Sequence, residues 1–170
     1  MDWTVLMVLF GAAFAAGLVD AIAGGGGLIT VPALLAVGLP PQVALGTNKL
    51  QASFGSGSAM LHFIRSGHVR LRDCRQGVLW TALGAGLGVW AVQLLDPVLL
   101  RRLIPWLLGG IAVYLSASPR LGQEDIHARL PAGLFYLVFG LLIGFYDGFL
   151  GPGTGSFWAM AFMLLLGYSM

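Results

Sequence analysis

The sequence predicts an all-α integral membrane protein, a polytopic bundle of helices, and three observations support this prediction. Of the 170 residues, 58% are hydrophobic and only 9% are charged, whereas soluble domains carry about 25% charged residues. The mean hydropathy is +0.87. The apolar stretches are long and lack the alternation of outer-membrane barrel strands. We therefore expect a lipid bilayer around the protein, and the composition excludes a soluble enzyme, a nucleic-acid-binding protein and a disordered chain.

Five apolar stretches are expected to form the long helices, since crossing a bilayer takes about 20 residues. They cover residues 3–22, 42–64, 76–95, 103–117 and 131–150. The second stretch is unusually polar near its start, and the fourth is short. Two further apolar pieces are shorter than an ordinary span, and they cover residues 28–39 and 156–170.

Each short piece follows a glycine-rich segment. The first segment is Gly24, Gly25, Gly26 and Gly27, and the second is Gly151-Pro152-Gly153-Thr154-Gly155. A glycine inside a helix costs about 1 kcal/mol relative to alanine, so we predict a break and then a half-helix at both places. A half-helix that begins at membrane depth presents backbone N–H groups and a positive dipole end to an anion. The alternative is that these glycines only permit close helix packing, as do the GxxxG spacings of Gly84 and Gly88 and of Gly140, Gly144 and Gly148.

Most other charged residues lie in short connections. Residues 65–75 hold four arginines and His68 against one acid, Asp73, so the positive-inside rule predicts a cytoplasmic loop there. Residues 119–130 mix acidic and basic side chains and are expected to form a solvated polar connector. This connector separates a first transmembrane unit, residues 1–118, from the beginning of a second, residues 131–170.

Two stretches of the chain resemble each other. Gly17, Asp20, Gly24 and Gly26 recur 127 positions later as Gly144, Asp147, Gly151 and Gly153. The aspartate match carries most weight, because the chain has only seven acidic residues. We interpret it as an internal duplication, the kind of repeat on which transporters are built. The counterpart of Lys49 would fall at position 176, so we expect two homologous repeats with the second one truncated.

Lys49 is the only lysine, and it lies in an apolar stretch beside Thr47 and Asn48. A charge at the bilayer centre costs at least about 2.5–3.5 kcal/mol, so Lys49 is expected to face a cavity or a partner. Helical spacing places it on one small and polar face with Ala52, Ser53, Ser56 and Gly57. The alternative is that Lys49, about 10 Å into the helix at 1.5 Å per residue, extends its ammonium to the interface.

Asp20 and Asp147 are the duplicated acids. A carboxylate at membrane depth can take up a proton or pair with a cation, so each is a candidate for ion coupling or for an ion pair with Lys49. An equally weighted alternative is a cap at a helix end. The histidines, cysteine and acids show no metal-binding spacing, and the sequence has no catalytic or cofactor motif. We therefore expect a non-enzyme without metal or cofactor.

Several of these motifs together are distinctive. They are Gly-Leu-Val-Asp-Ala-Ile-Ala-Gly-Gly-Gly-Gly-Leu-Ile-Thr-Val-Pro at 17–32, Gly-Leu-Pro-Pro at 38–41, Ala-Leu-Gly-Thr-Asn-Lys at 44–49 and Gly-Phe-Leu-Gly-Pro-Gly-Thr-Gly-Ser at 148–156. In this order they resemble the TauE/SafE family of membrane permeases, known as sulfite exporters or anion permeases. The last stretch looks like that family's second-repeat motif.

The resemblance implies a secondary transporter built from two related halves in the bacterial inner membrane. Its substrate would be sulfite, a sulfonate, another sulfur-containing organic acid or a different small anion. The matching substrate-binding positions are Gly24, Gly25, Gly26, Gly27, Thr47, Asn48, Lys49, Gly151, Gly153 and Thr154. The alternative function is a non-transporting membrane subunit whose polar groups only hold helices together. The sequence leaves the oligomeric state open, a homo-oligomer included.

Overall fold

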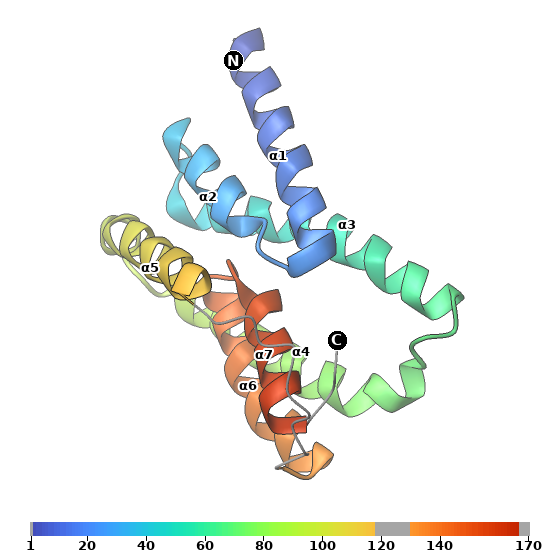
Figure 1. Cartoon of the computed structure of the whole chain (residues 1–170). Helices are drawn as coiled ribbons and strands as arrows, with labels where there is room; N and C mark the ends of the chain where they lie inside the picture. Colours follow the sequence, from blue (N-terminus) through green and yellow to red (C-terminus); the bar gives the residue numbers. More distant parts are fainter. Residues whose placement is uncertain (1, 118–129, 167–170) are drawn as a thin grey trace.

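The computed structural model describes residues 2–117 and 130–166 (Figure 1). Every regular element in these ranges is a helix. The helices are α1 (Trp3–Ala23), α2 (Gly27–Ala36), α3 (Pro41–Arg65), α4 (Leu71–Gln93), α5 (Pro97–Ala117), α6 (Ala132–Phe149) and α7 (Thr154–Leu166). The predicted all-α class is therefore confirmed, while nearly all of the predicted connector, residues 119–130, lies outside the described residues.

Three of these helices are long and apolar enough to cross a membrane. The qualifying segments are Trp3–Ile22, Pro97–Tyr114 and Ala132–Phe149, while α2 and α7 are apolar but shorter. Large apolar side chains project outward, among them Trp3 at 80% exposure and Ile22 at 86%. A hydrocarbon environment favours such exposure, which water would penalise. The chain is a multi-pass membrane protein.

The arginine-rich loop is shorter than predicted, because α4 begins at Leu71 rather than at residue 76. Arg72 and Arg75 consequently lie in the first turns of α4, and the connection from α3 to α4 is reduced to residues 66–70. The length of an apolar stretch misses such a charged helix start, because backbone hydrogen bonds, and not apolarity, define where a helix begins. By length and apolar composition, α3 and α4 are not among the three candidate spans.

The start of α5 also lies earlier than predicted, at Pro97 rather than at residue 103. Asp96 caps this helix, because its Oδ1 accepts hydrogen bonds from the N–H groups of Val98 at 2.6 Å and Leu99 at 3.4 Å. Proline at the first helical position lacks only an N–H that would have no partner in the helix. The Asp-Pro pair was the sequence signal for this boundary.

Both predicted helix breaks are present, and they are built alike. Gly24 ends α1 with a φ of 65°, and Gly151 follows α6 with a φ of 95°, a left-handed conformation that glycine adopts without strain. Each glycine donates its N–H to the carbonyl five residues earlier, that of Val19 or that of Tyr146. Helices α2 and α7 then begin at residues 27 and 154, the same 127-residue offset as the motifs. The duplication itself stays a prediction.

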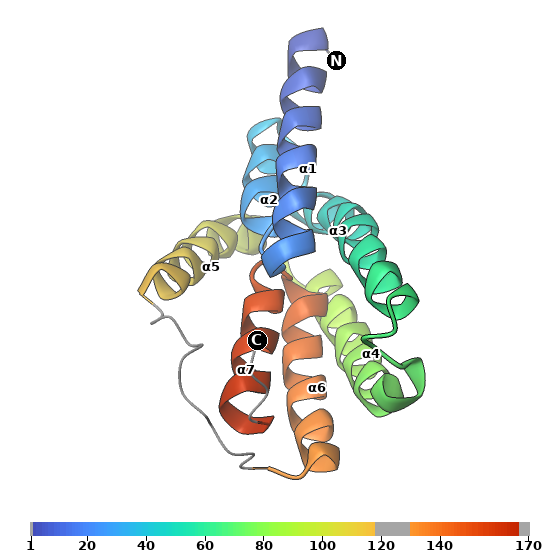
Figure 2. The same cartoon turned by 45° about the vertical axis from the view of Figure 1, so that its right-hand side comes forward.

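The two broken hairpins, α1–α2 and α6–α7, point their turns at each other (Figure 2). Gly155 donates its N–H to the carbonyl of Gly24 at 3.3 Å across this junction. The second break is shorter than predicted, since Thr154 and Gly155 already belong to the first turn of α7. Gly27 is likewise the first residue of α2.

Helices α4 and α6 pack closely against each other, and glycines permit this contact (Figure 1). A Cβ atom at Gly84 would collide with the carbonyl of Leu141, and one at Gly148 would collide with the carbonyl of Ala85. The other crowded glycines of this interface are Gly77, Gly88, Gly140 and Gly144. The GxxxG spacings therefore serve helix packing, as predicted.

A small apolar core holds the junction together. Its buried residues come from α2, α3, α4, α5 and the end of α6, and they are Val31, Leu45, Val92, Leu100, Ile104 and Leu150. Leu45 lies one helical turn before Lys49, and Leu150 precedes the second break. The core therefore fixes the start of α3 against the turn between α6 and α7.

Candidate functional site

A cavity of about 330 Å³ lies where the two helix breaks meet. This volume is at the small end of the roughly 300–1,000 Å³ typical of small-molecule sites. Its wall is formed by the α1–α2 hairpin, the α6–α7 hairpin and the helices α3 and α4. The lining residues are Asp20, Gly24, Gly27, Asn48, Lys49, Ala52, Ser53, Ser56, Thr81, Asp147, Gly151, Thr154, Gly155 and Trp158.

Lys49 forms an ion pair with Asp147 at this cavity, linking α3 to α6. Its Nζ lies 2.7 Å from Asp147 Oδ1, and the two side chains are 29% and 36% exposed. A Cβ atom at Gly151 would collide with the lysine ammonium, so this glycine leaves the space that Lys49 needs. The ammonium thus has a partner inside the protein and does not depend on reaching the interface.

Thr154 holds Asp147 from a second side. Its Oγ1 lies 2.9 Å from Asp147 Oδ1 and 2.5 Å from the carbonyl oxygen of Gly151. Tyr146, the preceding residue of α6, donates its hydroxyl to the carbonyl of Pro152 at 2.5 Å. The second break therefore closes into one hydrogen-bonded unit with the carboxylate of Asp147 facing the cavity.

Asp20 is bound differently from its counterpart. Its Oδ1 accepts the N–H of Gly26 at 2.7 Å, so this carboxylate caps the start of α2 within its own hairpin. A Cβ atom at Gly26 would collide with the carbonyl of Ala16 and with the carboxylate itself, which leaves only glycine for this position. The two duplicated acids therefore differ in their contacts, because Asp20 accepts a hydrogen bond at the start of α2 and Asp147 pairs with Lys49.

Two polar atoms beside the cavity have no hydrogen-bond partner among the described residues, Asp20 Oδ2 and Asn48 Oδ1. Asn48 is only 3% exposed. A buried acceptor that loses its partner costs about 1–3 kcal/mol. A ligand in the cavity that carries a donor would remove this cost, so Asn48 is suited to contacting a ligand.

Several backbone N–H groups of the breaks, which were expected to face an anion, bind internal acceptors. The N–H of Gly24 is shared between the backbone carbonyls of Val19 and Asp20. The N–H of Gly151 binds the carbonyl of Tyr146, and the N–H of Gly155 binds the carbonyl of Gly24. Tight turns closed by left-handed glycines use these groups themselves. The positive end of the α7 dipole and the ammonium of Lys49 remain as the attractive features for an anion.

The cavity gathers most of the predicted residues but not all of them. Thr47 is exposed elsewhere on α3, while Gly25, Gly26 and Gly153 are buried in the turns without lining the cavity. Sequence reasoning missed two lining residues, Thr81 and Trp158. The available signal for Thr81 was a lone hydroxyl on the small-residue face of α4, four residues before Ala85.

Gln51 sets the rotation of α3 from outside the cavity. Its Nε2 donates to the carbonyl of Ala13 in α1 at 3.3 Å, and its Oε1 accepts the hydroxyl of Thr30 in α2 at 3.2 Å. This polar group therefore binds both arms of the first hairpin and turns Lys49, two residues earlier, toward the second hairpin.

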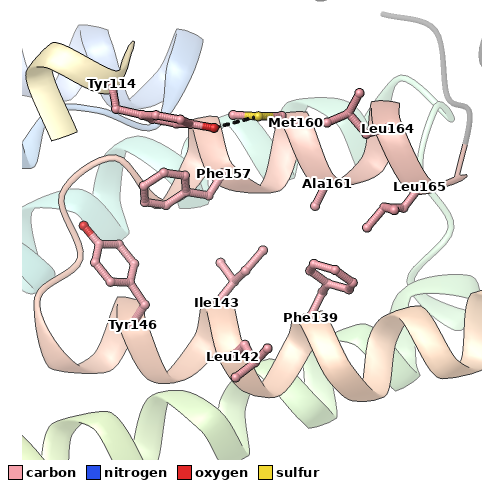
Figure 3. A pocket seen from close by; sticks show the side chains of 10 residues that line it. All are labelled: Tyr114, Phe139, Leu142, Ile143, Tyr146, Phe157, Met160, Ala161, Leu164 and Leu165. Carbon is pink, nitrogen blue, oxygen red and sulfur yellow. Dashed lines mark hydrogen bonds between the residues drawn. The ribbon is translucent and has the colours of Figure 1, made fainter. Parts of the chain in front are cut away.

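A second cavity, of about 380 Å³, lies between α6 and α7 and has a different character (Figure 3). Its wall is aromatic and aliphatic, and no charged side chain lines it. The hydroxyl of Tyr114 points to the sulfur of Met160 at 2.9 Å. This cavity offers no countercharge to an anion, so the candidate site is the cavity at the junction.

Broken helices that meet around charged side chains are typical of secondary transporters, and comparisons with known proteins agree with this class. The family described as "Sulfite exporter TauE/SafE" matches residues 9–170. The chain belongs to this family.

Curated relatives are named as membrane transporters. The chain is 48% identical over 170 residues to a "Probable membrane transporter protein" of Haemophilus influenzae, covering 98% of this chain and 65% of the relative. It is 48% identical over 166 residues to "Probable membrane transporter protein ORF9" of Sinorhizobium sp, covering 98% and 64%. It is 46% identical over 166 residues to "Probable membrane transporter protein YfcA" of Escherichia coli K12, covering 98% and 62%. The chain thus spans slightly less than two thirds of these relatives, and no solved structure gives a significant match.

Proposed function

We propose that the protein is a secondary transporter that carries a small anion across the cell inner membrane, with the junction cavity as its binding site. The observation that carries this proposal is Lys49, the only lysine of the chain, whose ammonium lines a cavity of about 330 Å³ between two helix breaks. A charged group at membrane depth is a functional feature by default, because its insertion is costly.

The cavity and the family description support a proposal for the substrate class. The cavity has room for a small anion, and the family description names sulfite. We therefore propose sulfite, a sulfonate or another sulfur-containing organic acid as the substrate. Lys49 would supply the countercharge, and the Nδ2 group of Asn48 would donate a directional hydrogen bond to an oxygen of the anion.

A non-transporting membrane subunit is the competing function, and one observation favours it. Lys49 and Asp147 already form an ion pair that links α3 to α6, which is what polar groups that only hold helices together would do. The two functions differ in whether Lys49 interacts with a solute.

Uptake of radiolabelled sulfite and of methanesulfonate into proteoliposomes tests the proposal. Lys49→Met should abolish uptake, because the charge is lost while the apolar bulk remains. Lys49→Arg should reduce it, since a broad planar guanidinium replaces a compact ammonium. Ser58→Ala on the same helix is the matched control, because the Ser58 hydroxyl is exposed and bonds only to its own helix backbone. Wild-type uptake by Lys49→Met, normalised to inserted protein, would refute the site.

A further inference from the structure

The ionisable side chains that line the cavity are one cation, Lys49, and two acids, Asp20 and Asp147. When all three side chains are ionised, their formal charges add up to −1. An incoming anion would change this sum to −2, and like charges repel one another more strongly in a partly enclosed cavity than in bulk water. One further positive charge in the occupied site would remove this added repulsion.

Thr154 contacts the acid that pairs with Lys49. Thr154 Oγ1 lies within hydrogen-bond distance of two oxygens, Asp147 Oδ1 at 2.9 Å and the Gly151 carbonyl at 2.5 Å. A threonine hydroxyl has one proton and can donate to only one of them. While Asp147 is ionised and paired with Lys49, Thr154 can donate to only one of these oxygens at a time. Once the pair opens and Asp147 carries a proton, the carboxyl group can donate to Oγ1 and Thr154 to Gly151, so both contacts are kept as hydrogen bonds.

We propose that the cavity binds its anion together with one proton, that Asp147 is the proton acceptor, and that Thr154 positions this proton. The inference rests on the proposed function and names the coupling ion for it. The anion replaces Asp147 as the partner of Lys49, and the released carboxylate takes up a proton from water.

The charges balance in this exchange. Before binding, the ammonium of Lys49 neutralises the carboxylate of Asp147. After binding, the ammonium neutralises the anion, one O–H bond has formed at Asp147, and the carboxyl group is neutral. The site has gained one anion and one proton, and its net charge is unchanged. No covalent bond to the anion forms or breaks.

Asp20 is the competing acceptor, because its Oδ2 is buried without a partner among the described residues. It differs from Asp147 in that it is not paired with Lys49 and its Oδ1 accepts the Gly26 N–H at 2.7 Å, so an anion that takes over Lys49 releases Asp147 and not Asp20. The other groups around Asp147 do not compete for the proton. Tyr146 uses its hydroxyl on Pro152, while α4 and α7 line the cavity with Thr81, Thr154 and Trp158, which stay uncharged.

Methanesulfonate is the probe that tests this inference, because it stays anionic throughout the accessible pH range. Binding to the protein in lipid nanodiscs is measured by calorimetry in two buffers of different ionisation enthalpy, which counts the protons taken up. Wild-type protein should take up about one proton per anion, and its affinity should rise by up to about tenfold per unit fall in pH.

Three variants locate the proton. Asp147→Asn mimics the neutral carboxyl group, so it should bind methanesulfonate without proton uptake and with little pH dependence. Asp20→Asn, the matched change in the other hairpin, should keep the proton uptake. Thr154→Val should move the pH profile of binding to lower pH, and Thr154→Ser, which restores the hydroxyl, should return it to the wild-type profile.

The outcomes separate this inference from the proposed function. Binding by the wild type with no proton uptake overturns the inference and leaves anion binding intact, and this measurement needs no variant. Loss of proton uptake in Asp20→Asn but not in Asp147→Asn also overturns it. Absence of methanesulfonate and sulfite binding to the wild type at every pH between about 5 and 8 refutes the proposed function itself.

Discussion

The N–H of Gly155, in the first turn of α7, donates to the carbonyl oxygen of Gly24 at the end of α1, at a distance of 3.3 Å. This bond joins two helix breaks that are more than a hundred residues apart in the sequence. It also brings the carboxylate of Asp147, which lies just before the second break, within reach of Lys49. The site therefore depends on the contact between the two turns.

Gly24→Ala should destabilise the protein and open this junction. A Cβ atom at Gly24 would lie 2.5 Å from Gly155 Cα, and the residue has a φ of 65°. Gly38→Ala is the matched control, because its φ is 87° but no atom lies within 4 Å of the new Cβ. Both changes carry the left-handed backbone cost of about 1–2 kcal/mol, and only Gly24→Ala adds a collision. Thermal unfolding in detergent should show a larger loss for Gly24→Ala, and equal losses would contradict the close contact.

Gly148→Ala and Gly86→Ala should change stability in opposite directions. A Cβ atom at Gly148 would collide with the carbonyl of Ala85 and push α6 away from α4, whereas one at Gly86 meets no atom within 4 Å. Gly86→Ala therefore gains the helix propensity of alanine, about 1 kcal/mol. The midpoint of thermal unfolding in detergent measures both effects. A stabilised Gly148→Ala variant would show that α4 and α6 are not in close contact.

Lys49→Met and Asp147→Asn should each cost more stability than the double variant. Removing one member of a fully buried ion pair costs about 3–5 kcal/mol. The side chains here are 29% and 36% exposed, so we expect a smaller loss, about 1–2 kcal/mol for each single change. The double variant leaves neither charge of the pair without its partner, so it should recover most of the stability lost in each single variant. A double-variant cycle of unfolding midpoints in detergent measures this coupling, and strictly additive losses would argue against the pair.

The connection between α3 and α4 should be cytoplasmic. Val69→Cys in a Cys74→Ser background places a single thiol on this exposed connection, away from Gly67, whose φ of 75° disfavours a side chain. The thiol should resist a membrane-impermeant maleimide in intact cells and react once the cells are permeabilised. Labelling in intact cells at the rate seen after permeabilisation would reverse the assigned orientation.

The class of protein, most helix bounds and the presence of both breaks could be predicted from the amino-acid sequence. These features follow from local physics, since apolar length sets which segments favour a bilayer and glycine runs disfavour a continuous helix. The prediction for α3 was residues 42–64, and the helix is Pro41–Arg65. The errors at α4 and α5 arose where a charged first turn or a capping aspartate extends a helix beyond its apolar stretch.

The contacts of the polar residues could not be predicted in this way, because they depend on how the helices pack. Asp20 and Asp147 are equivalent in the sequence motif, yet one caps α2 through Gly26 and the other pairs with Lys49. Thr47 and Lys49 are two residues apart, and only Lys49 lines the cavity. The physical reason is that an ion pair or a cavity wall depends on which helix faces are brought together. That choice is made by long-range packing, here by the core around Leu45 and by the bond between Gly155 and Gly24, and a local pattern does not contain it.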